Sequence, residues 1–338
     1  MGVSPRKREF CREYRSQNQG TELASYGPGA PVSMQQSAVE GGVDPLVGKR
    51  LREYMILELL GKGGMAKVYK ARHVLLNEIR AIKFLRPELR ERQECVARFH
   101  REAQIMVQLR SKHLVMLYEF GTVGHELLFL VMEYLEGETL RKRLRRTSWL
   151  PVPESVRIVQ QVALGLAEAH KHGIVHRDIS PDNVQLVHEN GEEIAKVIDF
   201  GIAKNLVGGG GKITQTMKLV GKAEYVAPEQ ICLPVGEDSK DAVDHRVDIY
   251  SLGVTFYELL TGSKPFEAKS SKAFLVKHLT ETPKPLSAMN PLIRVTPGIE
   301  DLVLRMLSKK KQERPESMES LYMELTALSH EEPLLTPV

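Results

Sequence analysis

The fold is decided by His176-Arg177-Asp178-Ile179-Ser180-Pro181-Asp182-Asn183, which is followed by Asp199-Phe200-Gly201 and then by Ala227-Pro228-Glu229. Two weaker signals precede these groups, a glycine-rich stretch at residues 61–68 and a lysine at position 83. Each weak signal has an ordinary structural explanation when it is taken alone. The order of all five along the chain therefore carries the argument.

The glycine-rich stretch reads Gly61-Lys62-Gly63-Gly64-Met65-Ala66-Lys67-Val68. Glycines let backbone N–H groups approach phosphate oxygens, because no Cβ stands in the way. An ordinary hairpin turn explains the same residues equally well. A Walker A loop is excluded, since that motif needs Gly-Lys-Ser/Thr leading into a helix and this stretch leads into a strand.

Lys83 lies in the apolar segment Ala81-Ile82-Lys83-Phe84, which has the pattern of a strand. Further along, Glu102 occupies a segment with helical spacing of apolar residues, from where it could reach back as the counter-ion of Lys83. The alternative is a solvated lysine at the edge of a strand.

Hydrophobic patterns predict strands at 54–60, 66–72, 80–85, 115–120 and 127–134, with one helix at 91–109 among them. After Gly137 the pattern becomes helical, with helices expected at 153–171, 247–260 and 298–307. Residues 1–46 are rich in Gly, Ser, Gln and Pro without an apolar period, so we expect a mobile tail there. Residues 329–338 form a second, C-terminal tail.

Taken in order, the five motifs resemble those of the eukaryotic-type (Hanks-type) protein kinases, and in particular the bacterial Ser/Thr kinases. The resemblance covers about residues 47–328. It implies an α+β bilobal protein-kinase fold, with an N-lobe (47–135) made of a five-stranded antiparallel sheet plus one helix. The C-lobe (136–328) is then mainly helical.

The resemblance also implies a division of roles in phosphoryl transfer from ATP. Asp178 orients the acceptor hydroxyl and takes its proton. Asn183 and Asp199 hold Mg²⁺, or Mn²⁺ as the alternative ion, while Lys83, braced by Glu102, holds the α- and β-phosphates. The remaining nucleotide contacts fall on Leu60, Gly61, Lys62, Gly63, Gly64, Met65, Ala66, Val68, Ala81, the gatekeeper Met132, the hinge residues Glu133 and Leu135, and Gln185.

Four positions depart from the family pattern, namely Ala66 in the glycine-rich stretch, Ser180, Gln185 and Lys222. Gln185 stands where an apolar residue usually packs below the adenine, and Ser180 stands where the catalytic loop usually has a lysine. Lys222 replaces the threonine that usually contacts that lysine and the catalytic aspartate. Our hypothesis is that the Lys222 ammonium takes the place of the missing lysine, with Ser180 making room. The alternative is that Lys222 points to solvent and that the enzyme is weakened.

The segment between residues 199 and 229 contains Thr214 and Thr216, which resemble the autophosphorylation pair of bacterial Ser/Thr kinases. The resemblance implies that they are phosphorylated in trans, through a transient homodimer, and that their phosphates pair with Arg177. An ordinary polar loop is the alternative. By the same resemblance, Asp248 supports the catalytic loop and Arg314 pairs with Glu229.

Composition limits the functions that remain. The net charge is +4 with 27% charged residues, which does not indicate a nucleic-acid binder. No apolar window is long enough to span a membrane, and the three cysteines are far apart, so we expect a cytoplasmic protein without disulfides. The basic run at residues 141–146 is read as a solvated helix face rather than a site for an acidic partner.

The function expected from this sequence is phosphorylation of Ser/Thr hydroxyls on protein substrates. A pseudokinase that serves as a binding module is the first alternative, because of the departures at Ala66, Ser180, Gln185 and Lys222. A small-molecule phosphotransferase on a related fold is the second. Ala227-Pro228-Glu229 speaks against it, because such enzymes generally lack a long segment ending in this motif.

Overall fold

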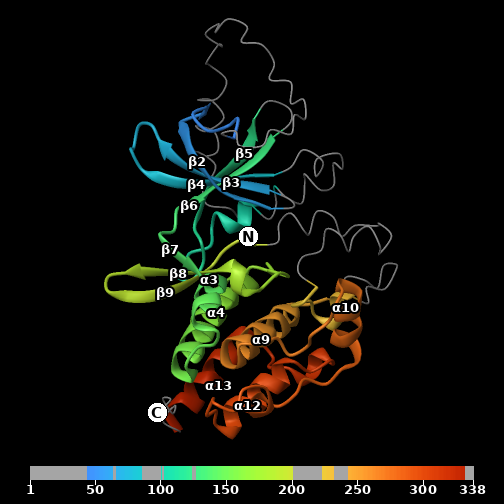
Figure 1. Cartoon of the computed structure of the whole chain (residues 1–338). Helices are drawn as coiled ribbons and strands as arrows, with labels where there is room; N and C mark the ends of the chain where they lie inside the picture. The colour runs from blue at the N-terminus through green and yellow to red at the C-terminus, as the bar shows by residue number, and fades with distance from the viewer. Residues whose placement is uncertain are drawn as a thin grey trace, which may run out of the picture. The chain divides into compact units, whose positions relative to one another are not determined.

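The computed structural model describes residues 44–63, 66–85, 100, 103–123, 127–200, 223–231 and 243–331. The chain divides into two units, residues 1–43 and 44–338, and all described residues belong to the second (Figure 1). Asp44 already contacts the sheet, because Lys67 Nζ and Tyr69 OH each donate a hydrogen bond of 2.8 Å to its carboxylate. The folded region thus includes residues 44–46, which the sequence assigns to the tail.

An antiparallel sheet forms the N-terminal part of this unit. Its strands are β1 (Arg50–Leu51), β2 (Tyr54–Lys62), β3 (Ala66–His73), β4 (Ile79–Leu85), β5 (Leu117–Val123) and β6 (Leu127–Glu133), in the order β1-β2-β3-β4-β6-β5. The five predicted strands are confirmed, and the two-residue strand β1 adds a sixth at one edge. Of the helix predicted at 91–109, only residues 100 and 103–109 are described, and Val107 donates a helical hydrogen bond of 3.0 Å to the Ala103 carbonyl.

The alternation of β4 decides where Lys83 points. Successive side chains of a strand face opposite sides of the sheet. Ile82 and Phe84 pack into a small cluster on one face, whereas Ala81 and Leu85 belong to the main core on the other. Lys83 has the parity of Ala81 and Leu85, so its ammonium is directed toward the helical part of the chain.

A smaller sheet and a set of helices form the rest of the unit (Figure 1). The sheet consists of β7 (Gly137–Thr139), β8 (Val184–Glu189) and β9 (Glu192–Val197). The helices are α3 (Leu140–Thr147), α4 (Val152–Lys171), α7 (Pro228–Ile231), α9 (Arg246–Thr261), α10 (Ser271–Thr280), α11 (Leu286–Met289), α12 (Pro297–Met306) and α13 (Met318–Glu331), with short 3₁₀ turns η2 (Pro181–Asn183) and η3 (Lys311–Glu313). The helices predicted at 153–171, 247–260 and 298–307 correspond to α4, α9 and α12.

Helix α9 is the centre of the helical part, because every residue from Val247 to Thr261 is buried. A helix that is buried on all sides must be surrounded by other elements, and α4, α11 and α12 pack against it. The helix ends at Gly262, whose φ of 75° lies in the left-handed region. None of the described helices combines the length and the hydrophobicity that crossing a bilayer would require.

The two parts are joined by the segment before β5. Val115 N donates to the Val197 carbonyl at 2.9 Å, and Val197 N donates to the His113 carbonyl at 2.8 Å. A Cβ at Gly165 of α4 would lie 2.7 Å from the His113 carbonyl oxygen, so only glycine allows this close approach. The large sheet is therefore anchored to β9 and α4, next to the loop that carries Asp199.

Candidate active site

The polar loop between α4 and β8 brings Asp178 and Asn183 into contact. Its last three residues form the 3₁₀ turn η2, which Pro181 begins with its preset φ. Within this loop the Asn183 side-chain amide donates to the Asp178 backbone carbonyl at 2.8 Å and to its carboxylate at 3.1 Å. Because the amide nitrogen is used in this way, the amide oxygen of Asn183 is the atom that can bind a cation.

Asp248, at the start of α9, binds the backbone of this loop. The carboxylate is fully buried and accepts backbone N–H groups from His176 at 2.8 Å and Arg177 at 2.7 Å. A third hydrogen bond of 2.8 Å joins it to Nε2 of His170 on α4. Burial would raise the pKa of Asp248, but the hydrogen bond with His170 and the neighbouring histidine and backbone groups lower it below its ordinary value.

His176 links the loop to the segment with Asp199. Its Nδ1 accepts the backbone N–H of Asp178 at 3.2 Å, so its Nε2 carries the proton and donates to the Ile198 carbonyl at 3.0 Å. The His176 ring also packs on Phe200, with 4.9 Å between the ring centroids. The catalytic loop and the Asp-Phe-Gly segment are thus held in a fixed relation.

Lys83 meets Asp199 across the two parts of the chain. Lys83 Nζ lies 2.8 Å from Asp199 Oδ1, and the lysine side chain is only 14% exposed. Asp199 and Arg177 have φ values of 59° and 63°, a region that costs energy for residues other than glycine. Strained backbone conformations cluster at functional sites, and here both belong to the residues around Lys83, Asp178 and Asn183.

The expected adenine contacts occupy neighbouring strands. β3 pairs with β4 so that Val68 lies opposite Lys83, and β4 pairs with β6 so that Ala81 lies opposite Met132. Ala81 and Met132 are buried, and Val68 packs against the same core. The described part of the glycine-rich turn, Leu60 to Gly63, is exposed, with Gly63 N donating to the Ala66 carbonyl at 2.8 Å.

Two of the residues that depart from the family pattern, Gln185 and Ser180, lie beside this site. Gln185 is partly exposed on β8, between Thr139 of β7 and Lys196 of β9. Ser180 is fully buried in the catalytic loop, and within the described ranges its hydroxyl has no hydrogen-bond partner. Several predicted site residues lie outside the described residues, namely Gly64, Met65, Glu102, Thr214, Thr216 and Lys222.

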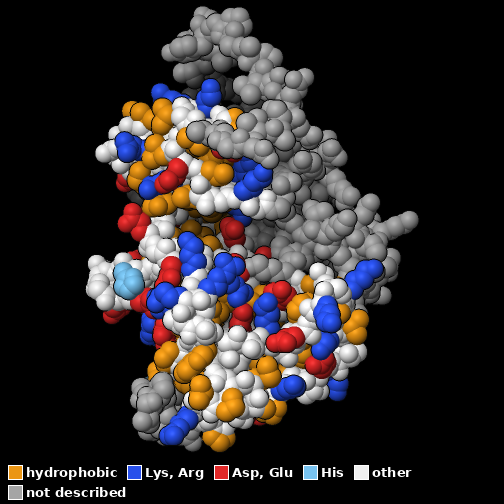
Figure 2. Space-filling view, viewed as in Figure 1, with side chains coloured by type: hydrophobic (Ala, Val, Ile, Leu, Met, Phe, Trp, Pro, Cys, Tyr) orange, Lys and Arg blue, Asp and Glu red, His pale blue; other side chains and the backbone are white. Residues whose placement is uncertain are grey.

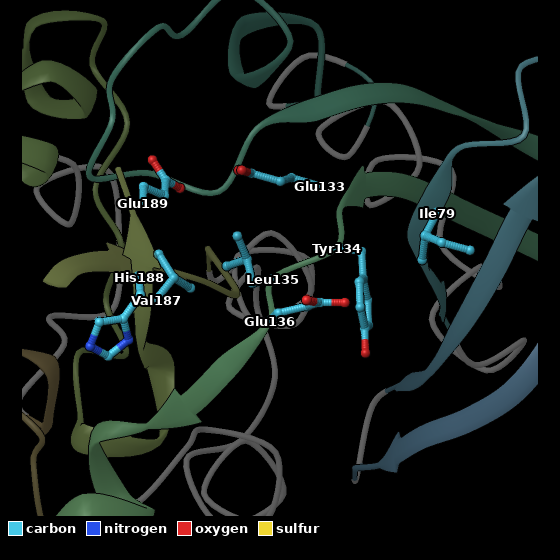
Figure 3. Close-up of a pocket in the computed structure, with 8 residues that line it drawn as sticks. All are labelled: Ile79, Glu133, Tyr134, Leu135, Glu136, Val187, His188 and Glu189. Carbon is cyan, nitrogen blue, oxygen red and sulfur yellow. The ribbon is translucent and has the colours of Figure 1, made fainter. Parts of the chain in front are cut away.

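The connection between the two parts carries an ion-pair cluster that the sequence analysis did not find. Lys196 is 5% exposed, and its ammonium lies 2.8 Å from both Glu133 Oε1 and Glu189 Oε1. Burial would lower the pKa of Lys196, but hydrogen bonds to the two glutamates raise it. Figure 3 shows Glu133 and Glu189 extending toward each other beside a pocket whose other walls include Leu135 and Val187.

Glu133 also fixes the backbone of this connection. Its N–H donates to the Met116 carbonyl at 2.9 Å, and its carboxylate accepts the Met116 N–H at 3.3 Å. The Glu133 carbonyl, which is expected to accept a hydrogen bond from adenine, is thereby held in place. The sequence alone could not predict the role of Lys196, because no sequence pattern shows that its strand lies beside Glu133.

The basic run at residues 141–146 differs from the expected solvated face. Arg141 and Arg143 are each 15% exposed in their side chains, and both are surrounded by carboxylates. Arg143 contacts Glu138, Glu154 and Glu193 at 2.6 to 2.7 Å. Figure 2 shows basic and acidic side chains intermixed on the visible face of the helical part. Three of the five basic residues of this run, Arg141, Arg143 and Arg146, thus pair with carboxylates of the chain, because α3 packs against acidic residues, some of them far away in sequence.

The remaining predicted structural pair is confirmed. The Arg314 guanidinium binds Glu229 through two hydrogen bonds of 2.6 and 2.9 Å, and its side chain is fully buried. It also donates to the carbonyls of Arg246 and Ser308 and lies over the Tyr250 ring. The Ala-Pro-Glu segment is therefore fastened to the helical core.

Comparison with known proteins assigns this arrangement to a family. A family model described as "Protein kinase domain" matches residues 54–325. The chain is 38% identical over 292 residues to the serine/threonine-protein kinase pkn3 of Myxococcus xanthus, covering 85% of this chain and 52% of that protein. It is 36% identical over 264 residues to the serine/threonine-protein kinase PknB of Mycolicibacterium smegmatis, covering 77% of this chain and 40% of that protein.

Solved structures give the same result for the fold. The crystal structure of the Mycobacterium tuberculosis PknI kinase domain superposes with a TM-score of 0.63 at 25% identity. The match covers 83% of this chain and 98% of that one. The part of the chain that matches corresponds to one kinase domain. The chain spans about half, or less, of the length of the curated relatives it matches.

Proposed function

The chain belongs to the protein kinase family, and we propose that it transfers the γ-phosphoryl group of ATP to Ser or Thr hydroxyls of proteins. One observation carries this proposal: Lys83 meets Asp199, while Asn183 contacts Asp178 on an adjoining loop that Asp248 holds rigid. Phosphoryl transfer depends mainly on positioned charges. The four side chains supply an amine for phosphates, a carboxylate for the acceptor proton, and two oxygen donors.

The oxygen donors of the site suit a divalent metal ion. Mg²⁺ is usually held by one or two carboxylates together with substrate phosphates, rather than by a cage of protein ligands. The Asp199 carboxylate and the Asn183 amide oxygen match this pattern, and the described ranges contain no group of three or more His, Cys, Asp or Glu side chains that could hold a metal ion by themselves. Bound Mg²⁺, or Mn²⁺, would neutralise the charge that develops on the transferred phosphoryl group.

The protein groups then have separate tasks. Lys83 holds the α- and β-phosphates, and its ion pair with Asp199, a proposed metal ligand, supports this role. Asp178 accepts the proton of the attacking hydroxyl, and the Asn183 amide keeps its carboxylate oriented. The hinge residues Glu133 and Leu135, with Val68, Ala81, Met132 and Gln185, form the adenine site.

The preference for Ser and Thr over Tyr is supported by the curated relatives, which are named serine/threonine-protein kinases. The catalytic loop also lacks the Ala-Ala-Arg or Arg-Ala-Ala sequence typical of tyrosine kinases. Incubation with [γ-³²P]ATP and a mixture of Ser, Thr and Tyr peptides, followed by phosphoamino-acid analysis, tests the proposal. We expect phosphoserine and phosphothreonine only; phosphotyrosine as the main product would refute it.

Lys222 belongs to this proposal as a substitute for the missing lysine of the catalytic loop. Support comes from the sequence exchange between positions 180 and 222 and from the buried Ser180 hydroxyl, which has no partner in the described ranges. Loss of one cation near the transferred phosphoryl group lowers kcat by about 10²-fold or more. We therefore expect Lys222→Ala to lower kcat strongly with little change in ATP affinity. Unchanged turnover in Lys222→Ala would show that the exchange idea is wrong.

Regulation is proposed to act through Thr214 and Thr216. We expect them to be phosphorylated in trans, in a transient homodimer, and to pair with Arg177, an exposed residue of the catalytic loop. Mass spectrometry of an active preparation should find phosphate on this pair of threonines. The three widely spaced cysteines suit a reducing cytoplasm, which is where we place this signalling function.

A further inference from the structure

Arg141 of α3 lies at the centre of a polar cluster beside the catalytic loop. Its guanidinium contacts Asp182 Oδ2 at 3.1 Å and Glu258 Oε1 at 2.6 Å, and it donates a short hydrogen bond to Tyr225 OH. Tyr225 OH in turn donates to Glu258 Oε2 at 2.5 Å. The cluster thus connects four segments: α3, the catalytic loop, α9 and the segment before Ala-Pro-Glu.

The cluster forms a largely buried cation site rather than an ion pair on the surface. Glu258 is 7% exposed and the Arg141 side chain 15% exposed, whereas Asp182 is 36% exposed and reaches solvent. Burial would lower the pKa of Arg141, yet its hydrogen bond to Glu258 and the neighbouring Tyr225 and Glu258 raise it. Burial and the Glu258 charge also raise the pKa of Tyr225, so this hydroxyl stays neutral. Two carboxylates therefore surround one guanidinium.

The position of the cluster relates it to the protein substrate. Asp182 lies between Asp178 and Asn183, and Tyr225 comes shortly before Ala-Pro-Glu. An extended peptide advances roughly 3.3 Å per residue. Asp182 follows Asp178 by four residues in the same loop and reaches solvent. We therefore expect a substrate whose hydroxyl reaches Asp178 to bring a side chain about two to four residues away toward Asp182. An arginine at such a position would meet a carboxylate already bound by an arginine of the enzyme.

We propose that Arg141 is a specificity-determining residue, because its guanidinium occupies from within the chain a cation site formed by Asp182, Tyr225 and Glu258. This inference rests on the proposed protein kinase function for its effect on substrates, but the cation site itself does not. With Arg141 in place, the site is closed to basic substrate side chains. Without Arg141, it becomes a binding site for a substrate arginine.

Peptide pairs test the effect on substrates. Each pair differs only by Arg or Ala at one position within about four residues of the phosphorylated Ser, and the ratio of kcat/KM within a pair measures the preference. For wild type we expect a ratio near or below unity at every position. For Arg141→Ala we expect a rise of about tenfold at one position, which is the effect of one charge-assisted hydrogen bond.

Matched variants keep this test specific. Arg143→Ala removes an arginine of the same helix, equally buried among carboxylates but away from the catalytic loop, so its ratios should equal those of wild type. Adding Glu258→Gln to Arg141→Ala should reduce the new preference, because one carboxylate of the site is lost. Ratios for Arg141→Ala that equal those of wild type at all positions would overturn the proposal.

Methylguanidinium probes the cation site without any activity. In a thermal unfolding assay it should raise the Tm of Arg141→Ala by about 2–4 °C near saturation, while leaving wild type unaffected. Tetramethylammonium at equal concentration, which cannot donate hydrogen bonds, should have no effect. If Arg141→Ala folds poorly, methylguanidinium should restore its cooperative transition. No response of the variant, or an equal response of wild type, would contradict the cation site even if the kinase is active.

Discussion

Replacing Asp248 by Asn tests how strongly the fold fixes the catalytic loop. The buried carboxylate accepts hydrogen bonds from His176 N, Arg177 N and His170 Nε2. Asparagine has the same shape but only one acceptor oxygen, so at least one buried N–H loses its partner, at a cost of about 1–3 kcal/mol. The other bonds lose their charge assistance. We expect the free energy of unfolding to fall by about 3–5 kcal/mol in total.

The same change should impair catalysis beyond its effect on stability. Arg177 keeps a left-handed backbone conformation, worth about 1–3 kcal/mol of strain, which its hydrogen bond to Asp248 helps to maintain. If the loop relaxes by about 1 Å, kcat falls by about 10²-fold. Urea denaturation gives the stability, and steady-state assays well below the Tm give kcat.

Thr255→Val on the same helix is the control for this prediction. Thr255 is equally buried, but its hydroxyl donates only to the Ser251 carbonyl of its own helix, so its removal should cost little. The pH dependence gives a second check. The pKa of Asp248 lies below its ordinary value of 3.8, so its stabilisation is present above about pH 4 and lost below. A loss of less than about 1 kcal/mol with unchanged kcat would refute the reasoning.

Three further predictions concern other parts of the chain. Arg314→Lys removes the two-pronged bond to Glu229 from a fully buried site, and chemical denaturation should show a loss of about 2–4 kcal/mol. Burial and the Lys309 charge lower the pKa of His278 to about 4, so the wild-type unfolding free energy should fall by about 3 kcal/mol between pH 6.5 and 4, and less in His278→Gln. Lys196→Met should raise the KM for ATP about fivefold but not that for a peptide, whereas Lys196→Arg should retain low values.

Much of the fold follows from short-range patterns in the sequence. The apolar segment around Lys83 predicts β4. Both faces of this strand carry apolar residues, so the side of the sheet to which the lysine points is known only from the structure. The antiparallel sheet and the helices α4, α9 and α12 are also predicted within a few residues. Strand β1 was missed because its two residues, Arg50 and Leu51, are too short to show any period.

The candidate site could be proposed from the sequence because its residues form compact motifs. Asp178 and Asn183 lie in one loop, and the structure shows that they touch. By contrast, Arg141, Lys196 and Glu258 became visible only in three dimensions, since each pairs with residues distant in sequence. Charge patterning predicted a solvated face for Arg141, because sequence alone does not show which distant carboxylates a basic run will meet.

The central claim is that this cleft performs phosphoryl transfer and does more than bind nucleotide. The most direct measurement compares Mg-ATP binding with transfer of the γ-phosphate, in wild type and in Asp178→Asn, using one preparation of each protein. We predict equal ATP affinity within about threefold, but a loss of transfer of about 10²–10⁴-fold in the variant. Binding without measurable transfer in wild type, or equal transfer in both proteins, would contradict the claim.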